Sequence, residues 1–335
     1  MRIWFNHWFS AIYHSINMMR ENNPSFTFVG SSENEHAVYK RACDEWYVEP
    51  GGLSEREYVD FCIDFCKKHK IDVFVPRRNL TQIVLEKERF DALGVKLFAD
   101  DCKELQLILD DKIKTYEYIR EINKEIVPDF YVATSLEEFK EGYGKLKEKG
   151  YTVCYKLTVD EGARSFRVVK DDAYGASSIY EKPGSKITLE HALIILSSYD
   201  FSVPVLLMPY LNGVEISIDC MKMDDESIII PRYKTSKRFS TVKFDKEIMA
   251  LCKELLDRLN CKMVMNVQFK LLNNKPYLLE INPRMSGGLQ LSCKASGINL
   301  PSVALNYLLG KKEEWRYPEF TSAKVVHIET PVCLD

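Results

Sequence analysis

The stretch 266–288, NVQFKLLNNKPYLLEINPRMSGG, predicts a β-hairpin, because two apolar runs flank a polar break at residues 273–275. We expect a three-residue loop that pairs Leu272 with Pro276. Side chains along a strand alternate between its faces, so this register gathers the polar residues on one face. A two-residue loop would slip the register by one residue and place polar groups in the apolar layer.

The predicted polar face is rich in side-chain oxygen. Its members are Asn266, Gln268, Glu280 and Asn282, with Lys270 and Leu278 nearer the turn. The opposite face is apolar and carries Val267, Phe269, Leu271, Tyr277, Leu279 and Ile281. A carboxylate with carboxamides suits Mg²⁺, which binds one or two carboxylates together with substrate phosphate oxygens. Arg284 follows at once, with a guanidinium that suits a phosphate. The alternative is an ordinary half-exposed hairpin whose polar face is only solvated.

The composition is typical of a globular protein. The chain has 335 residues, enough for two or three lobes, of which 46% are hydrophobic and 28% charged. Its net charge of −3 gives no electrostatic reason to expect nucleic acid or an anionic membrane as a partner. No apolar run reaches about 18–20 residues, so we expect no transmembrane span. The N-terminus is apolar but interrupted by polar residues, which favours a first strand and helix over a signal peptide.

The ten cysteines are scattered without paired spacing, which indicates reduced thiols and a cytoplasmic location. Cys62 and Cys66 lie four residues apart on one predicted helical face. They could bind a metal or pack in a core. Packing is favoured, because no second pair of cysteines or histidines stands nearby.

The N-terminal third alternates between strand and helix patterns. Strands are predicted at 2–6, 26–31 and 71–75, and helices at 8–20 and 55–70. This alternation indicates a parallel α/β sheet. No glycine follows the first strand, so we expect no binding of NAD or FAD here.

Arg77 and Arg78 follow the strand 71–75, at the edge where open α/β sheets bind their ligands. They are candidates for anchoring a substrate carboxylate. The alternative is a pair of solvated surface arginines.

The middle of the chain carries a lysine on a predicted hairpin. A helical pattern runs over 102–122 and includes Lys112. The strand 151–158 places Lys156 opposite its apolar side chains, and a second strand is predicted at 166–170. A hairpin with a lysine and a glycine-containing tip could cover phosphate groups of a ligand. The alternative is an exposed lysine that only increases solubility.

The last third predicts strands at 203–208, 214–223 and 227–231 and a helix at 246–259, before the hairpin. The basic run 232–238 includes Arg232 and Lys237. We consider it a candidate for binding a substrate carboxylate or a γ-phosphate. A solvated edge strand is the alternative.

The sequence NVQF, followed by LLEINPRMSGG and KASG, resembles the nucleotide site of the ATP-grasp superfamily, and most of all its carbamoyl-phosphate-synthase-like branch. The specific part is Glu-x-Asn-Pro-Arg, with Gln268 twelve residues before its glutamate. The resemblance covers nearly the whole chain and implies an ATP-grasp fold of α/β and α+β lobes. These are a preATP-grasp domain with a parallel sheet at 1–105, a linker and lid at 106–204, and a C-terminal lobe with the metal site at 205–335. ATP would bind between the last two.

The resemblance also implies which residues bind ATP and Mg²⁺. Glu280 and Asn282 are the implied Mg²⁺ ligands, with Gln268 beside them, and Mn²⁺ is an alternative ion. Arg284 and Lys156 would stabilise charge on the transferring phosphoryl group. The other residues implied near the nucleotide are Lys112, Gly162, Ser165, Met208, Tyr210, Leu211 and Glu215.

Two stretches depart from the family pattern. The hinge beside adenine reads Met208-Pro209-Tyr210 where the family usually has a carboxylate, and Pro209 has no N–H to donate. The lid loop at 162–165 has fewer glycines than usual. Both departures bear on how tightly the chain binds a nucleotide.

The function implied by the resemblance is that of an ATP-dependent ligase. A carboxylate is activated as an acyl phosphate, and an amine or another nucleophile then displaces phosphate. The expected partners are small-molecule acids and amines, held by candidates among Arg77, Arg78, Arg232 and Lys237, and a homodimer is a further expectation. The alternatives are a degenerate nucleotide-binding module without ligase activity and a small-molecule kinase.

Overall fold

The computed structural model describes residues 1–159, 164–176, 184–236, 239–328, 331 and 333. The chain forms two compact units. The first contains Met1–Asp110, Val214–Phe269 and Leu279–Asp335, and the second contains Asp111–Gly213 and Lys270–Leu278. The expected division into three lobes, at residues 105 and 204, stays a prediction. Among the described helices none has the length and apolarity needed to cross a bilayer.

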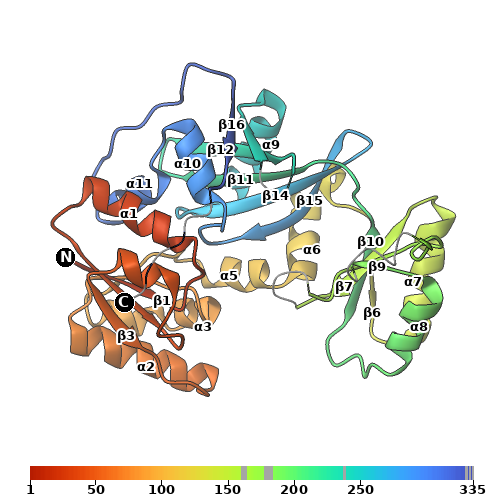
Figure 1. The fold of residues 1–335 in the computed structure, drawn as a ribbon, viewed down its shortest axis with the longest axis horizontal. Coiled ribbons are helices and arrows are strands. Elements are labelled where there is room, and N and C mark those ends of the chain that lie inside the picture. Colours follow the sequence, from red (N-terminus) through yellow and green to blue (C-terminus); the bar gives the residue numbers. More distant parts are fainter. Residues whose placement is uncertain (160–163, 177–183, 237–238, 329–330, 332, 334–335) are drawn as a thin grey trace. The chain divides into compact units, whose positions relative to one another are not determined.

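The first unit begins with a five-stranded sheet in the order β3-β2-β1-β4-β5, in which every neighbouring pair is parallel (Figure 1). Its strands are β1 (Arg2–Asn6), β2 (Thr27–Ser32), β3 (Glu45–Val48), β4 (Val73–Val75) and β5 (Lys96–Leu97). The expected parallel α/β sheet is confirmed. The strand order reverses direction between β1 and β4, which is the switch point where open α/β sheets bind ligands at their carboxyl ends.

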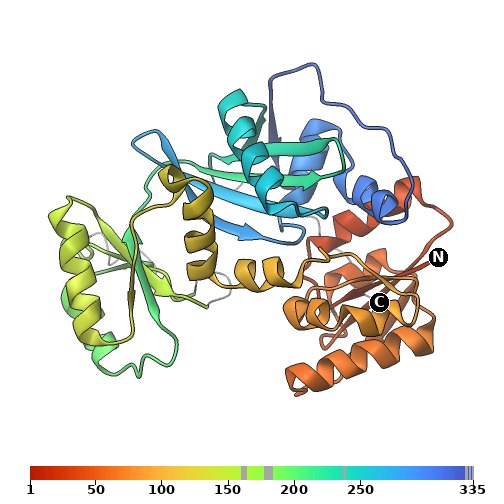
Figure 2. The same cartoon turned by 180° about the vertical axis from the view of Figure 1, so that it is seen from behind.

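Helices of this part of the chain connect and cover the strands (Figure 2). They are α1 (Ile12–Asn22), the 3-10 helix η1 (Val38–Ala42), α2 (Glu55–His69), α3 (Leu80–Leu85), α4 (Lys87–Asp91) and α5 (Lys103–Asp110). Helix α2 starts with a capping box, in which Ser54 Oγ accepts from Glu57 N and the Glu57 carboxylate accepts from Ser54 N.

Helix α1 begins at Ile12, later than the expected residue 8. The backbone N–H of His7 donates to Ser31 O at 2.7 Å, and that of Trp8 donates to Tyr39 Oη at 3.2 Å. These bonds tie the start of the segment to β2 and η1. The chain therefore turns before it can enter a helix.

An aromatic stack fills the core between the sheet and α2. The ring of Trp4 lies between Phe65, with centroids 4.2 Å apart, and Phe74, with centroids 4.1 Å apart. Cys62 and Cys66 are buried in the same core, and burial raises the pKa of both thiols. The packing interpretation of this cysteine pair is confirmed.

The second unit has a five-stranded sheet in the order β6-β10-β7-β8-β9. Its strands are β6 (Tyr131–Ala133), β7 (Val153–Leu157), β8 (Arg167–Val169), β9 (Lys186–Ile187) and β10 (Val205–Pro209). Its helices are α6 (Lys112–Ile122), the 3-10 helix η2 (Lys124–Ile126), α7 (Leu136–Glu148) and α8 (Leu189–Ser197). The pairs β6-β10, β10-β7 and β7-β8 are antiparallel.

The prediction of one continuous helix over residues 102–122 is wrong. Helix α5 ends at Asp110 and α6 begins at Lys112. The side chain of Asp111 caps α6 by accepting from Ile113 N at 2.8 Å and from Lys114 N at 3.1 Å. An aspartate stabilises a helix start in this way, and here that interrupts the helical pattern.

The third sheet has six strands in the order β15-β14-β11-β12-β13-β16. Its strands are β11 (Glu215–Lys222), β12 (Ser227–Lys234), β13 (Phe239–Lys243), β14 (Met265–Leu272), β15 (Lys275–Asn282) and β16 (Ser322–Val326). The helices of this part are α9 (Lys246–Leu259), α10 (Leu289–Ser296) and α11 (Leu300–Leu308). Strand β12 pairs with β11 and β13, so Arg232 lies inside the sheet and not on an edge strand, which was the alternative for the basic run.

The hairpin turn differs from the expectation. Strand β14 ends at Leu272 and β15 begins at Lys275, so the loop has two residues and the expected three-residue loop is wrong. Asn273 and Asn274 have φ values of 52° and 65°. Asparagine tolerates the left-handed region, and two such residues form the tight turn that matches the twist of a hairpin.

The two-residue turn changes which side chains are exposed. Leu278, expected on the polar face, is completely buried, and so is Asn266. The buried residues of β15, Leu278 and Ile281, are three apart, and an odd spacing places side chains on opposite faces of a regular strand. The single polar face expected for this hairpin is therefore not present in that form.

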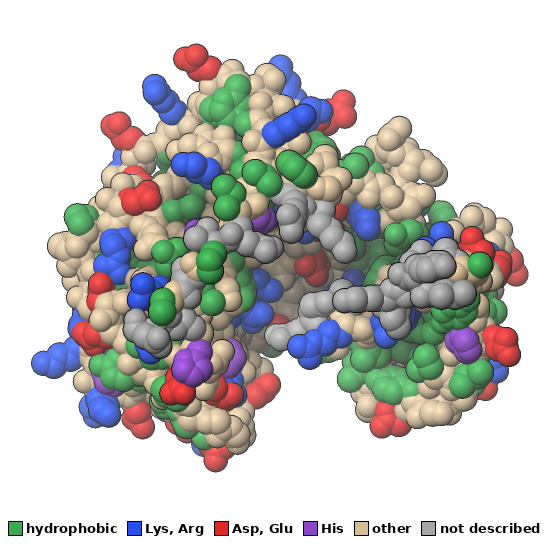
Figure 3. Space-filling view, viewed as in Figure 1, with side chains coloured by type: hydrophobic (Ala, Val, Ile, Leu, Met, Phe, Trp, Pro, Cys, Tyr) green, Lys and Arg blue, Asp and Glu red, His purple; other side chains and the backbone are tan. Residues whose placement is uncertain are grey.

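Charged side chains of both signs are scattered over the face shown in Figure 3. An ion pair joins β1 to β3 in the N-terminal sheet. Arg2 donates to both carboxylate oxygens of Glu45 at 2.7 Å. These hydrogen bonds lower the pKa of Glu45 to about 2.

We predict that Glu45→Gln lowers the free energy of unfolding at neutral pH by less than about 1 kcal/mol, because the pair is partly exposed. A carboxyl group with a lowered pKa in the folded state stabilises the fold above its ordinary pKa and loses this effect as the pH falls. Urea unfolding should therefore show that the difference between parent and variant shrinks from about pH 5 to about pH 3. A difference that stays constant over this range would contradict the ion pair.

Candidate functional site

Three of the predicted site residues form a chain of side-chain contacts at the end of β15. Asn282 Nδ2 donates to Glu280 Oε1 at 3.0 Å, and Arg284 Nη2 donates to Asn282 Oδ1 at 3.2 Å. All three side chains are partly buried. The structure therefore brings a carboxylate, a carboxamide and a guanidinium together at this strand end.

The second group belongs to β14. Gln268 Nε2 donates to Asn266 Oδ1 at 2.8 Å. Asn266 Nδ2 in turn donates to Ser217 Oγ at 3.0 Å and to Asp219 Oδ1 at 2.9 Å. Asn266 is completely buried, so it supports neighbouring residues and is not open to a ligand. Gln268 is partly exposed.

Asp219 supports the loop that carries Arg284, a role that the sequence reading missed. Its buried carboxylate accepts from Ser286 Oγ at 2.6 Å and from Ser292 Oγ at 2.5 Å. Ser286 belongs to the loop after Arg284, and Ser292 to helix α10. The alternation of polar residues at 215, 217 and 219 was a sequence signal for this network.

Arg232, predicted as a substrate residue, is buried and completes this support. Its Nε donates to Ser292 Oγ and its Nη2 to Ser217 Oγ, both at 3.2 Å. A Cβ on Gly288 would clash with the guanidinium of Arg232, so a side chain at that position would have to displace this guanidinium. The guanidinium thus packs directly under the loop, which makes a structural role the better interpretation of Arg232.

The donor set fits a magnesium ion that arrives with a nucleotide. Within the described residues there is no group of three or more His, Cys, Asp or Glu side chains that could hold a metal. Glu280 provides one carboxylate and Asn282 a carboxamide oxygen beside it, whereas the contact shown for the Gln268 side chain is with Asn266. Mg²⁺ usually binds one or two carboxylates and completes its shell with substrate phosphates and water. These residues therefore suit a metal–phosphate complex better than a bare ion.

The predicted lysines lie in the second unit. Lys156 is buried on β7, opposite Leu206 of β10. Lys112 Nζ donates to Thr158 O at 3.3 Å, and Ser165 Oγ accepts from Leu157 N at 2.9 Å. Both contacts are made within two residues of Lys156. The structure therefore gathers these three predicted residues around the end of β7, while Gly162 lies outside the described residues.

The predicted hinge Met208–Leu211 is part of the same sheet. Met208 and Leu211 are buried, and Pro209 pairs with Val153. The backbone N–H of Tyr210 donates to Thr152 O at 2.6 Å. The sheet therefore uses the N–H of Tyr210, and Pro209 has none.

Two further candidates belong to the first unit. Glu215 forms an ion pair with Lys234 across β11 and β12. Arg78 donates to Glu33 Oε1 at 2.5 Å and lies over the ring of Tyr58, so it is not a freely solvated surface arginine. Lys237 lies outside the described residues.

The chain is similar to a known protein family and to known sequences. The family model "ATP-grasp in the biosynthetic pathway with Ter operon" matches residues 201–331. The carbamoyl phosphate synthase large chain of Clostridium acetobutylicum is 27% identical over 274 residues. That match covers 77% of this chain and 24% of the relative, so the chain spans about a quarter of that protein's length.

Solved structures share the fold at low sequence identity. The biotin carboxylase domain of the Hydrogenobacter thermophilus 2-oxoglutarate carboxylase, in complex with MgADP, ADP and bicarbonate, matches with a TM-score of 0.69 and 14% identity, over 94% of this chain and 71% of that one. The N5-carboxyaminoimidazole synthetase of Staphylococcus aureus, complexed with ADP, matches with a TM-score of 0.67 and 12% identity, over 93% and 78%. Biotin carboxylase from Campylobacter jejuni matches with a TM-score of 0.67 and 15% identity, over 94% and 72%.

We predict that Asp219→Ala destabilises the fold by about 3 kcal/mol, because it leaves several buried donors without their acceptor. Ser286→Ala removes only one of these hydrogen bonds and should cost about 1 kcal/mol. Chemical denaturation of the two variants measures both effects. Equal losses for the two substitutions would show that the Asp219 carboxylate does not hold the network together.

The family model and the shared fold agree with the motif that ends at Arg284. The parallel sheet and the two mostly antiparallel sheets form the mixed α/β architecture of the ATP-grasp fold. The chain therefore has the fold of these structures, its residues 201–331 are similar to an ATP-grasp family, and its sequence is similar to a carbamoyl phosphate synthase large chain.

Proposed function

We propose that this protein is an ATP- and Mg²⁺-dependent ligase that activates a carboxylate as an acyl phosphate and joins it to an amine. The observation that carries the proposal is the contact chain Glu280–Asn282–Arg284. In it, the carboxylate proposed to bind the metal and the guanidinium proposed to bind phosphate belong to one hydrogen-bonded group. The buried Asp219 network fixes the loop that carries that guanidinium.

In the proposed reaction, an oxygen of the substrate carboxylate attacks the γ-phosphorus of ATP, and ADP leaves. Phosphoryl transfer is helped mainly by positioning and by charge neutralisation. Arg284 and Lys156 take up the negative charge that develops on the phosphoryl oxygens. The rest of the nucleotide is bound by Lys112, Ser165 and the segment Met208–Leu211. Its ribose is bound or supported by Glu215. A Mg²⁺ ion held by Glu280, Asn282 and Gln268 would neutralise phosphate charge when bound, and Mn²⁺ is a substitute.

The acyl phosphate is then attacked by an amine. The amine nitrogen forms a bond to the acyl carbon, the C–O bond to phosphate breaks, and inorganic phosphate leaves with the electron pair. Exclusion of water protects the acyl phosphate from hydrolysis during this step.

The substrates belong to the classes of small acids and amines. Bicarbonate is the first acid to test, because it is bound in the 2-oxoglutarate carboxylase domain that shares this fold. Arg77 is our candidate for an anchor of a substrate carboxylate, and Lys237 is a second one.

The proposed setting is the cytoplasm. The ten cysteines are free thiols in the structure. That is typical of a reducing compartment. We also propose a homodimer, since the related biotin carboxylase domain was solved as a dimer.

A nucleotide-binding module without ligase activity is the second candidate. The hinge favours it, because Pro209 has no N–H and the N–H of Tyr210 is bonded to Thr152 O. A small-molecule kinase is the third. The mass of the product separates the kinase from the ligase, because only ligation joins two substrates.

We predict that Glu280→Gln and Arg284→Ala each reduce ADP release at least about 100-fold, because each removes charge that stabilises the transferring phosphoryl group. The assay uses Mg·ATP with bicarbonate and a pool of amino acids. Circular dichroism checks that both variants are folded.

The matched controls are Glu314→Gln and Arg316→Ala, which change the same residue types at exposed positions. Both should keep the parent rate. Full ADP release by Glu280→Gln or Arg284→Ala would rule out this assignment of the site. A thermal shift with Mg·ATP but no ADP release would favour the binding module.

A further inference from the structure

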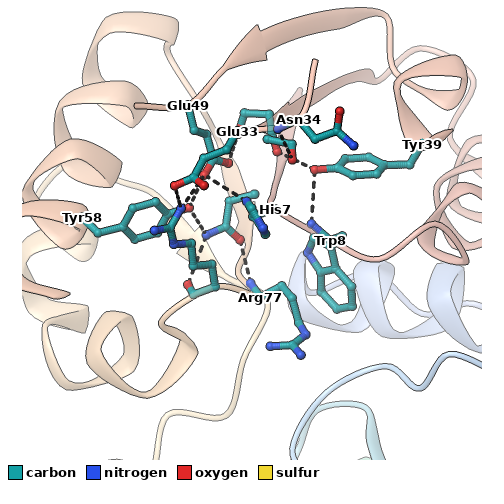
Figure 4. Close-up of polar contacts among 12 residues, drawn as sticks. His7, Trp8, Glu33, Asn34, Tyr39, Glu49, Tyr58 and Arg77 are labelled. Atoms are coloured by element: carbon teal, nitrogen blue, oxygen red, sulfur yellow. Dashed lines mark hydrogen bonds and ion pairs between the residues drawn. The ribbon is translucent and has the colours of Figure 1, made fainter. Parts of the chain in front are cut away.

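A second cluster of polar side chains lies at the carboxyl end of the N-terminal sheet (Figure 4). His7 follows β1, Glu33 follows β2, Glu49 follows β3 and Arg78 follows β4. The carboxyl ends of parallel strands meet at one edge, and the switch point between β1 and β4 is where such sheets bind ligands. The contacts of each of these side chains indicate which kind of ligand could bind at this edge of the sheet.

His7 is held in a conformation that costs energy. Its φ is 42°, in the left-handed region that residues other than glycine rarely adopt. Its Nδ1 is buried without a hydrogen-bond partner among the described residues and lies 3.9 Å from Glu49 Oε2. The side chain is 40% exposed although its Nδ1 is buried, so the exposed surface belongs to the rest of the side chain. A strained backbone and an unsatisfied ring nitrogen together indicate selection for a ligand rather than for stability.

Glu49 is fixed behind His7. Its carboxylate is fully buried and accepts from Ser31 Oγ at 2.7 Å and from Tyr58 Oη at 2.8 Å. Burial raises the pKa of Tyr58, which keeps its hydroxyl protonated as a donor. Asn6 Nδ2 donates to the same hydroxyl at 3.0 Å. The carboxylate therefore has a defined position beside the imidazole ring.

The charges around His7 favour a cationic group. Two carboxylates, Glu33 and Glu49, face one guanidinium, that of Arg78, which lies 2.5 Å from Glu33 and 3.9 Å from Glu49. The hydrogen bond from Arg78 lowers the pKa of Glu33, so Glu33 is ionised at neutral pH. The guanidinium of Arg77 points away from this cluster (Figure 4). With a neutral imidazole the cluster has a net charge of about −1, which attracts an ammonium group and repels a carboxylate.

This edge also adjoins the loop that carries the phosphate-binding arginine. A Cβ on Gly287 would lie 3.7 Å from Phe9 Cε2, so the segment after β1 packs against the loop after Arg284. Helix α1, which follows Phe9, also packs against α10 and α11. Both segments belong to the first unit. A ligand at His7 is therefore on the same body as the proposed metal site.

We propose that the cluster His7–Glu33–Glu49 binds the amino group of the nucleophile substrate, a small primary amine. The inference rests on the proposed ligase function and assigns the place of its second substrate. An ammonium N–H donates to His7 Nε2, while Glu49 orients the ring and Glu33 adds negative charge. Transfer of that proton to Nε2 leaves a neutral amine. Its lone pair attacks the acyl carbon, phosphate leaves, and the remaining excess proton on nitrogen passes to water.

The test is a titration of the full-length chain, labelled in its histidine rings, followed by NMR. The chain has six histidines, and His7→Gln identifies the signal of His7. Three probe mixtures are compared at equal concentration: amino-acid amides, which carry only the amine, N-acetyl amino acids, which carry only the carboxylate, and free amino acids. We expect the amides and the free amino acids to move the His7 signal in a saturable way. The N-acetyl mixture should leave it in place.

The matched control is His36, an exposed histidine of the same lobe that lies 3.3 Å from Glu35. Its signal should not respond, and His36→Gln should leave the response of His7 unchanged. Glu49→Gln should weaken the binding of the amides about tenfold. Because Glu49 is buried, the exposed Glu33→Gln is the second variant, with an expected loss of about threefold.

An equal response of His7 to the N-acetyl mixture would overturn the proposal, and so would the absence of a response to all three mixtures. The proposed ligase function fails separately. If the amides bind at His7 but the parent chain releases no ADP with bicarbonate and amino acids, the site stands and the ligase does not. If ADP is released and the amides do not bind, the ligase stands and this site does not.

Discussion

A carboxylate buried inside a protein has to be hydrogen-bonded, and Asp219 meets this constraint by binding the loop that follows Arg284. The partners Ser286 and Ser292 lie on both sides of the tight passage at Gly288, under which the guanidinium of Arg232 is packed. The loop therefore cannot shift without leaving a buried charge unsatisfied. This fixes the backbone that carries Arg284, and a fixed backbone suits the phosphate-binding role that we propose for this arginine.

The two proposed sites of the first unit follow the same design. In each, a buried carboxylate holds a more exposed functional side chain: Asp219 acts through the loop of Arg284, and Glu49 acts on His7. Each carboxylate accepts from hydroxyl groups, those of two serines for Asp219 and those of a serine and a tyrosine for Glu49, and Asp219 also accepts from the amide of Asn266. Hydroxyl donors hold a carboxylate in place without neutralising it. The negative charge therefore stays available to bind or orient a cationic partner.

The sequence predicted the parts of the fold that depend on local patterns. The parallel sheet, the cysteines packed in its core and the motif around Glu280 and Asn282 all follow from periodicity or from a resemblance to a family. The sequence pattern did not predict the two-residue turn at Asn273–Asn274 or the helix break at Asp111. At both places a short polar side chain determines the local backbone conformation, and the hydrophobic pattern does not record this.

The residues that support the two proposed sites contact segments that are distant in the sequence. The sequence pattern therefore could not predict them. Ser217 and Ser292 reach Arg232 from another strand and from a helix, so the basic run suggested a substrate residue where the structure has a structural one. The strain at His7 and the burial of Glu49 are likewise visible only when the strand ends are assembled. The sequence motif gave the residues that we propose to bind phosphate, and the structure adds the residues that support them.

The most direct test of the central claim is a crystal structure with Mn²⁺ and a non-hydrolysable ATP analogue, in which anomalous scattering locates the metal. The account predicts a metal peak at about 2.1 Å from an oxygen of Glu280 and from Asn282 Oδ1, with the γ-phosphate within reach of Arg284. Manganese bound to phosphates that lie away from Glu280 and Asn282 would contradict it.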